Sequence, residues 1–441
     1  MRVLNRSETT TGGPNMLLVK NAHVVDAKTH TDAVLDILID QGRIQKMESS
    51  IQVADSDAVT IIDAKENYVI PGLVDVHVHF RDPGFTYKED IETGAKAAAK
   101  GGITSVVLMA NTKPVVDNVD TLKYVLEKGA KTKIHVHTCA AITKDLKGGE
   151  LTNMPELLKE GAVGFTDDGI PILDENLLRE AMVEAAKLKV PVSLHEENPK
   201  YIENNGVNAG GVAASHYGIG GSDRMAEISM IERDIQIALE TGAVLNVQHI
   251  STKEGVELVR QGKKKGQNIH AEATPHHFTL TEEAVVKHGT LAKMNPPLRT
   301  EEDRQAIIEG LKDGTIDLIA TDHAPHSEEE KAKEITQAPS GIIGLETALP
   351  LAITNLVKAG HLTMEQIVDR MSYAPAVLYG LDAGYIEVGG PADLVIVDDN
   401  KQHTVGNYES KSYNSPFTGE QLYGTIMYTI AGGEIAYERE E

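Results

Sequence analysis

Residues 71–80 read PGLVDVHVHF, and this stretch decides the fold that we expect. Successive side chains of a β-strand point to opposite faces, so His77 and His79 would project together while their apolar neighbours pack behind them. Two imidazoles on one face of a strand form half of a metal site. The spacing alone is weak evidence, because the chain contains a second such pair at His135 and His137.

The central part of the chain, 72–359, alternates between short apolar runs and amphipathic helical patterns, which is typical of parallel βα architecture. One such helix is predicted over 174–189, with Asp174 as its N-cap. Eight apolar runs can be counted: VDVHVH (74–79), ITSVVLMA (103–110), KIHVHTCA (133–140), AVGFT (162–166), VPVSLH (190–195), AVLNVQH (243–249), NIHAEAT (268–274) and IDLIAT (316–321). Eight strands close a TIM-like (β/α)8 barrel, which we predict here. Periodicity leaves an open doubly wound sheet as the alternative.

Both ends of the chain differ from this central part. Residues 16–70 and 384–441 are rich in Val, Ile and Tyr and are broken by Gly-containing turns, which predicts short antiparallel strands. The simplest packing joins them into one small β-sandwich-like domain beside a barrel of residues 71–383. Residues 1–15 are polar and Gly/Thr-rich, and we expect either a flexible extension or the product of an upstream start site, in both cases without a function.

Composition narrows the classes of function. The 441 residues, 41% of them hydrophobic, can form one large domain and a smaller one. The net charge of −24 would repel nucleic acid and an anionic membrane surface, so an anionic small molecule would need a local Arg or Lys. Cys139 is the one cysteine, so no intramolecular disulfide can form, and the cytoplasm is the expected location. A zinc site would have to use His and carboxylate ligands.

In a βα barrel, functional groups lie at the C-terminal ends of the strands. Five predicted strands end in His or Asp, namely in His77 and His79, in Asp167 and Asp168, in His195, in His249 and in Asp322. Such ligands suit a catalytic Zn²⁺ or Mn²⁺ centre. With one of the two adjacent aspartates counted, six ligands exceed what one tetrahedral ion needs, but they fit two ions that share a bridging carboxylate and a bridging hydroxide. The predicted reaction is attack on a carbonyl by metal-activated hydroxide.

Each of these residues also has a structural alternative when it is taken alone. Asp167 or Asp168 could form a turn, and His195 or His249 could be a hydrogen-bonded core histidine. Asp322 could cap a helix. Their joint placement on several strand ends is what favours the metal site.

A series of motifs extends this argument over nearly the whole chain from residue 16 onward. They are GLVDVHVHFRDPG (72–84), NTKPV (111–115), TDDG (166–169), the histidine at 195, QHIST (248–252), EATPHH (272–277), KMNPPLR (293–299) and ATDHAPH (320–326). In this order and spacing they closely resemble the type I dihydroorotases of the amidohydrolase superfamily. The resemblance implies a zinc enzyme that reversibly cyclises N-carbamoyl-L-aspartate to L-dihydroorotate and water in de novo pyrimidine (UMP) biosynthesis.

The resemblance also implies roles for individual residues. His77 and His79 would hold one zinc ion with Asp168, which bridges to a second ion held by His195 and His249. Asp322 would touch the metal centre and act as the general acid and base. The implied substrate contacts are Arg81, Asn111, Asn295, His326, Ser340 and Gly341. A guanidinium such as that of Arg81 suits a dicarboxylic substrate, although an ion pair with Asp82 is the alternative.

Other segments near these motifs carry weaker expectations. The charged segment 326–341 is expected to be a mobile loop that closes over the site, or else a solvated surface loop. Ala110 stands where the family commonly has Pro. Glu196 follows His195 at a position where many relatives have Cys. Neither departure removes a ligand.

Two rival functions remain from the sequence. A hydantoinase, dihydropyrimidinase or allantoinase generally bridges its metals with a carboxylated lysine, where this chain has TDDG (166–169). A non-catalytic barrel that supports aspartate transcarbamoylase typically loses metal ligands, whereas all six are present here. The resemblance further implies a homodimer and a possible association with aspartate transcarbamoylase, with no nucleic-acid or membrane partner.

Overall fold

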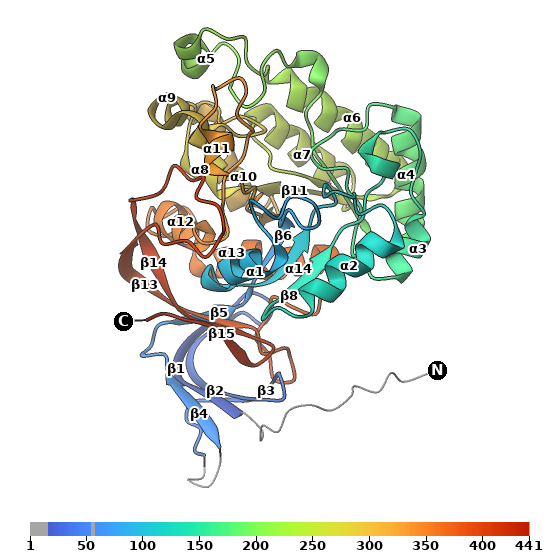
Figure 1. The fold of residues 1–441 in the computed structure, drawn as a ribbon. Helices are drawn as coiled ribbons and strands as arrows, with labels where there is room; N and C mark the ends of the chain where they lie inside the picture. Colours follow the sequence, from blue (N-terminus) through green and yellow to red (C-terminus); the bar gives the residue numbers. More distant parts are fainter. Residues whose placement is uncertain (1–15, 54–57, 441) are drawn as a thin grey trace.

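The computed structural model describes residues 16–53 and 58–440 of the chain. The extension predicted for residues 1–15 lies outside the described residues. Figure 1 shows a barrel surrounded by helices and, below it, a β domain that both ends of the chain build. Among the described residues, no helix combines the length and the apolar character needed to cross a bilayer.

The barrel strands follow the apolar runs of the sequence closely. They are β6 (Leu73–Val78), β7 (Ile103–Leu108), β8 (His135–Thr138), β9 (Pro191–Leu194), β10 (Val244–Val247), β11 (Ile269–Ala273) and β12 (Leu318–Ile319). All neighbouring pairs are parallel, in a sheet of β6–β8 and a sheet of β9–β12. Parallel strands buried on both faces explain why these runs are almost continuously apolar.

The fourth predicted strand is short, and Phe165 is its bridging residue. Phe165 pairs with Ala140 after β8 and with Val192 in β9, so it joins the two sheets. On the other side, Val78 of β6 pairs with His323 just beyond β12. These bridges close the eight-membered barrel. Backbone hydrogen bonds from Val163 to the Thr138 carbonyl and from Thr166 to the Ala140 carbonyl continue the pairing of the fourth strand, before the chain turns into Asp167 and Asp168.

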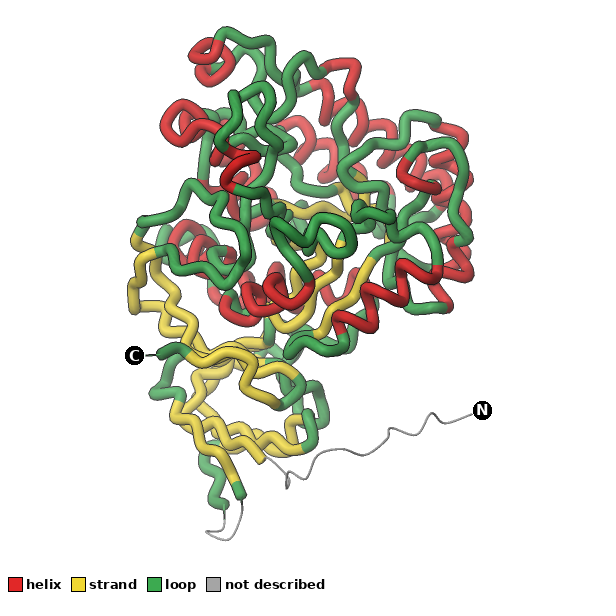
Figure 2. The backbone as a smooth tube through the Cα atoms, in the orientation of Figure 1, coloured by secondary structure: helices red, strands yellow, loops and turns green. Residues whose placement is uncertain are grey.

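Helices cover the outside of the barrel, as Figure 2 shows in red. They are α1 (Ile91–Lys100), α2 (Val119–Gly129), α3 (Met154–Lys159), α4 (Glu175–Leu188), α5 (Val212–Tyr217), α6 (Met225–Thr241), α7 (Lys253–Lys265), α8 (Pro275–Thr279), α9 (Glu283–His288), α10 (Glu301–Asp313), α11 (Glu328–Lys331), α12 (Ala348–Ala352), α13 (Met364–Val368) and α14 (Ala374–Tyr379). The helix predicted behind Asp174 is α4. The Asp174 carboxylate accepts hydrogen bonds from the backbone N–H groups of Asn176 and Leu177, which confirms the predicted N-cap.

The β domain is one eight-stranded sheet that folds over its own hydrophobic core. Its strands are β1 (Met16–Asp26), β2 (Thr31–Asp40), β3 (Arg43–Glu48), β4 (Val59–Asp63), β5 (Tyr68–Pro71), β13 (Leu394–Thr404), β14 (Gln421–Ala431) and β15 (Glu434–Glu438). The two chain ends meet where β5 pairs with β13. The expectation of purely antiparallel pairing is wrong, because β4 and β5 both run parallel to β1. A parallel pair needs a crossover connection, and β2 and β3 supply it.

Candidate active site

The six predicted metal ligands meet at the C-terminal ends of the barrel strands. His77 and His79 extend from the end of β6, and the other four follow the fourth, fifth, sixth and eighth strand positions. All are buried except the Asp322 side chain, which is 15% exposed. Two groups of three can each surround an ion: His77, Asp168 and His249, and His77, His79 and Asp322. The barrel thus gathers residues that are far apart in the sequence into one buried cluster.

Asp168 divides this cluster into two halves. Its Oδ2 atom lies 3.4 Å from His77 Nε2 and 3.2 Å from His79 Nε2. Its Oδ1 atom lies 3.5 Å from His195 Nδ1 and 4.0 Å from His249 Nε2. One carboxylate therefore presents a separate oxygen to each pair of histidines, which is the arrangement of a bridging ligand.

Asp322 belongs to the half of the cluster that contains the first pair of histidines. Its Oδ1 atom lies 3.2 Å from His77 Nε2 and 3.0 Å from His79 Nε2. Burial works against ionisation of Asp322, but the attraction of His77 and His79 outweighs it and holds the pKa of this carboxyl well below its usual value. Burial likewise works against ionisation of Asp168, but the attraction of His77 and the neighbouring histidines outweighs it and holds the pKa of Asp168 well below its usual value. Both carboxyls are therefore anionic and suited to a cation.

The histidines are oriented by partners on the far side of their rings. His77 Nδ1 contacts Glu272, His195 Nε2 lies 2.8 Å from Glu197 Oε1, and His79 Nδ1 lies 2.9 Å from Asn111 Oδ1. Each oxygen accepts an N–H from its ring, so the other ring nitrogen of each histidine faces the cluster and can give its lone pair to a metal ion that replaces its proton. Sequence reasoning missed Glu272 and Glu197. The one sequence feature that could have indicated them is a carboxylate inside an apolar strand, as for Glu272, or shortly after one, as for Glu197.

The arrangement fits a bound cation. His77 Nε2 is buried and has no hydrogen-bond donor or acceptor among the described residues, although two carboxylates face it. His195 Nδ1 and His249 Nε2 face each other at 2.9 Å. With the Nε2 hydrogen of His195 directed to Glu197, the space between these two nitrogens suits an ion that accepts lone pairs. Four imidazoles and two carboxylates without a thiolate suit a divalent metal ion.

Neighbouring residues that competed with the ligands in the sequence point elsewhere. Asp167 turns away from Asp168, and its Oδ1 accepts hydrogen bonds from the backbone N–H groups of Ile142 (2.8 Å) and Thr143 (3.0 Å). His135, of the second histidine pair, contacts Asp393 of the β domain at 2.9 Å. Both are structural contacts outside the cluster.

Arg81 lies beside the cluster without a carboxylate partner. Its Nε donates to the carbonyl oxygen of Pro325 at 3.2 Å, and no ion pair of Arg81 occurs within the described part of the chain. The alternative partner, Asp82, is buried and instead contacts Lys128 and the hydroxyl of Tyr124. Burial lowers the pKa of the Arg81 guanidinium, but an arginine remains charged. The guanidinium is therefore available to an anionic ligand.

The other predicted substrate contacts differ in whether their polar atoms already have hydrogen-bond partners. Asn295 Oδ1 and Ser340 Oγ are buried without hydrogen bonds among the residues described. Asn111 uses its oxygen on His79, which leaves its NH2 group for a ligand. His326 is engaged on both ring nitrogens, since Nε2 donates to the carbonyl oxygen of Ser340 (2.8 Å) and Nδ1 accepts from Lys88 Nζ (3.2 Å). Gly341, the residue after Ser340, has a φ of 137°, and its N–H donates a hydrogen bond to the Lys293 carbonyl oxygen.

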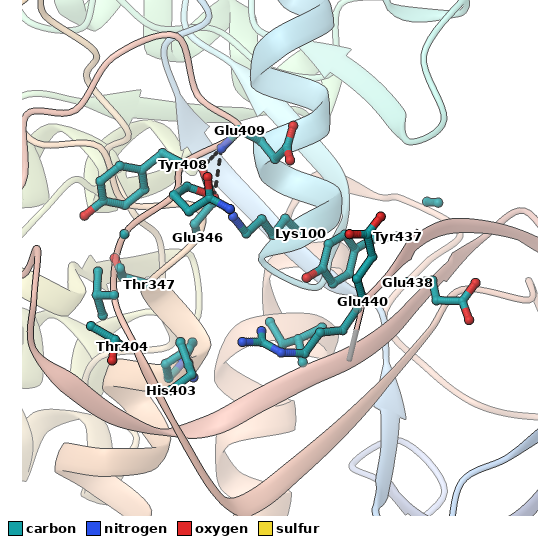
Figure 3. Close-up of a pocket in the computed structure, with 17 residues that line it drawn as sticks. Lys100, Glu346, Thr347, His403, Thr404, Tyr408, Glu409, Tyr437, Glu438 and Glu440 are labelled. Carbon is teal, nitrogen blue, oxygen red and sulfur yellow. Dashed lines mark hydrogen bonds and ion pairs between the residues drawn. The ribbon is translucent and has the colours of Figure 1, made fainter.

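A surface cavity of about 540 Å³ lies elsewhere, between the barrel and the β domain. Figure 3 shows its lining, with Lys100 and Glu346 from the barrel side and His403 and Tyr437 from the β domain. It contains none of the six clustered residues. This cavity is therefore separate from the cluster, which remains the candidate active site.

Comparison with known proteins shows the family to which the chain belongs. The model of the amidohydrolase family matches residues 68–436. A dihydroorotase of Clostridioides difficile is 55% identical over 96% of this chain and 100% of its own length, and one of Lactococcus lactis is 49% identical over 96% and 99%. The solved L-hydantoinase of Arthrobacter aurescens superposes with a TM-score of 0.86 at 28% identity over 96% of each chain. The chain therefore belongs to the amidohydrolase family and, within it, to the dihydroorotases, which are metal-dependent cyclic amidohydrolases.

Proposed function

We propose that this chain is a type I dihydroorotase that interconverts N-carbamoyl-L-aspartate and L-dihydroorotate at two zinc ions, in the pyrimidine biosynthesis of the cytoplasm. The observation that carries the proposal is the division of Asp168 between two histidine pairs, with Asp322 at one of them. His77 and His79 would hold one ion and His195 and His249 the other. Bound zinc supplies Lewis acidity, which lowers the pKa of water and polarises a carbonyl oxygen.

Asp322 is the proposed general base and acid. Its low pKa keeps it ionised, and its 15% exposed side chain is the most open of the cluster, so it can reach a substrate. In the ring-opening direction it takes a proton from the attacking water and delivers it to the amide nitrogen as the carbon–nitrogen bond breaks. In the ring-closing direction these proton transfers are reversed.

Arg81 is the proposed anchor for the substrate carboxylate. An acidic protein with a net charge of −24 repels a dicarboxylate at long range, so binding needs a local cation that no protein carboxylate neutralises. A guanidinium can bind a carboxylate with two parallel hydrogen bonds. We propose Asn111, Asn295, His326 and the Ser340–Gly341 backbone as further substrate contacts. Since both ring nitrogens of His326 are engaged, its contact would require the bond to Ser340 or Lys88 to open.

The domain organisation and the partners form the remainder of the proposal. We propose that 71–383 is the catalytic barrel and that 16–70 with 384–441 is the β domain. We also propose a homodimer and association with aspartate transcarbamoylase. Light scattering of the purified chain, alone and mixed with aspartate transcarbamoylase, tests both.

The solved hydantoinases with the same fold define the experiment that tests the reaction itself. Zinc-loaded protein is incubated separately with L-dihydroorotate, hydantoin and allantoin, and ring opening is followed. We expect turnover of L-dihydroorotate, and formation of L-dihydroorotate from N-carbamoyl-L-aspartate in the reverse assay. Turnover of hydantoin without any turnover of L-dihydroorotate would refute the proposal.

A further inference from the structure

Two buried carboxylates stand behind the metal cluster, one in each half. Glu272 is fully buried in β11 and contacts His77 Nδ1. Glu197 is 4% exposed and contacts His195 Nε2 at 2.8 Å. Neither is paired with Lys or Arg in the described parts of the chain. Among the residues that the structure describes, their only potentially cationic partners are these histidines. Burial of a carboxylate away from Lys or Arg is costly, so the histidine contact is what offsets the cost.

The other two histidines lack such support. His79 Nδ1 is 2.9 Å from the neutral amide oxygen of Asn111. His249 Nδ1 is buried and has no hydrogen-bond partner among the described residues. Each half of the cluster therefore combines one histidine backed by a carboxylate with one that is not.

Glu272 is itself held rigidly within the barrel. Its Oε2 accepts from Asn246 Nδ2 at 2.9 Å, and the same nitrogen lies 2.9 Å from Ser193 Oγ. Ser193, Asn246 and Glu272 come from the neighbouring strands β9, β10 and β11 and form a polar chain beneath the cluster. Glu272 Oε1 also accepts the backbone N–H of His249 at 3.3 Å. A carboxylate fixed in this way can fix the ring that it contacts.

We propose that Glu272 and Glu197 are positioning residues that set the tautomer and raise the basicity of one histidine at each metal position. Glu272 keeps the hydrogen of His77 on Nδ1, so that Nε2 is a ligand. Glu197 keeps the hydrogen of His195 on Nε2, so that Nδ1 is a ligand. A negative charge behind the ring increases electron donation to a cation, and loss of such a partner typically costs roughly 10- to 100-fold in metal affinity. The inference rests on the proposed two-metal site.

The test measures zinc affinity without using turnover. Glu272→Gln and Glu197→Gln keep an oxygen acceptor of nearly the same shape but remove the charge. Glu346→Gln is the matched control, because Glu346 is also largely buried but lies on the cavity of Figure 3, where it pairs with Lys100 at 3.2 Å. Zinc affinities come from competition with a chelator, and the zinc anomalous signal in crystals at limiting zinc gives the occupancy of each position.

We expect a selective result. Glu272→Gln should weaken the His77/His79 position roughly 10- to 100-fold, Glu197→Gln should weaken the His195/His249 position by a similar factor, and Glu346→Gln should match the wild type. Unchanged affinities in both variants, or equal weakening of both positions by each variant, would overturn the inference while the two-metal site stands. A wild-type protein that binds no zinc at the cluster would instead overturn the proposed function.

Discussion

At the scale of single residues, orientation decides which of two adjacent aspartates can take part in chemistry. Asp167 and Asp168 share a turn, yet Asp167 satisfies backbone N–H groups of the preceding loop and Asp168 faces four imidazoles. A buried carboxylate that is saturated by N–H donors has little capacity left for a cation, whereas one surrounded by ring nitrogens is a natural ligand. This contrast provides a neighbouring control for substitutions in the cluster.

Asp322→Asn is the sharpest residue-scale prediction. The amide cannot take up a proton as a carboxylate does, and it is a weaker metal ligand, so we expect kcat to fall roughly 10²- to 10⁴-fold. Circular dichroism should show the fold retained. Asp167→Asn, which keeps Oδ1 as an acceptor for Ile142 and Thr143, should remain active within a few-fold. A near-normal rate for Asp322→Asn would refute its assigned role.

Arg81→Met should act chiefly on substrate binding. Loss of a charge-assisted contact to a carboxylate is worth about 1.5–3 kcal/mol, so we expect KM to rise roughly 10- to 100-fold with a smaller change in kcat. Arg81→Lys should recover part of the loss, because it restores the charge without the planar fork. If steady-state kinetics showed both parameters unchanged, Arg81 would be structural.

The sequence predicts the residues of the site unequally. The six clustered residues follow from strand ends and from ordered motifs, since the barrel rule places strand ends together. Between Asp167 and Asp168 the residues alone left the choice open, and the resemblance selected Asp168. Glu272 and Glu197 could not be assigned, because their roles depend on which ring nitrogen they contact across the barrel.

At the scale of elements, the segment 326–341 is more structured than its charged composition suggested. It contains the short helix α11, which Ser327 caps. Two largely buried lysines hold the rest, since Lys331 Nζ donates to the Pro339 carbonyl at 2.8 Å and Lys293 Nζ donates to the Ala338 carbonyl at 2.6 Å. Composition could not predict these two contacts, because the lysines of a charged segment are normally exposed to solvent. Closure of the segment over the substrate stays a prediction.

From the lowered pKa of buried Lys331 we predict that the free energy of unfolding depends on pH. Burial, together with the charge of Lys293 and against the attraction of Glu330, lowers its pKa from 10.5 to about 7. Below pH 7 both folded and unfolded chains carry the proton and the cost of burial is fully present. Between about pH 7 and 10.5 the unfolded chain binds more protons, so this group makes stability rise with pH, by at most about 1.4 kcal/mol per pH unit.

Lys331→Met removes this titration. Urea unfolding of both proteins at pH 6, 8 and 10 should show the wild type gaining stability relative to the variant as pH rises. A difference in unfolding free energy that stays constant across this range would contradict the lowered pKa.

At the scale of the whole molecule, the barrel brings together side chains that are as far apart in the sequence as His77 and Asp322. The β domain packs beneath it, where β5 leads directly into β6 and so into the first histidine pair. The sequence predicts this architecture because apolar runs and helical patterns alternate regularly. It could not predict how short the fourth strand is, since the pairing of Phe165 depends on Ala140 and Val192, which are distant from it in the sequence.

In the proposed function, one cluster, divided by Asp168, binds two zinc ions and opens the ring of L-dihydroorotate. Protein stripped with a chelator is titrated with zinc, and bound metal per chain is measured together with L-dihydroorotate turnover. We predict negligible turnover without metal and full recovery as occupancy approaches two ions per chain. Full turnover by the stripped protein, or zinc bound at two ions per chain without any turnover of L-dihydroorotate, would contradict the account.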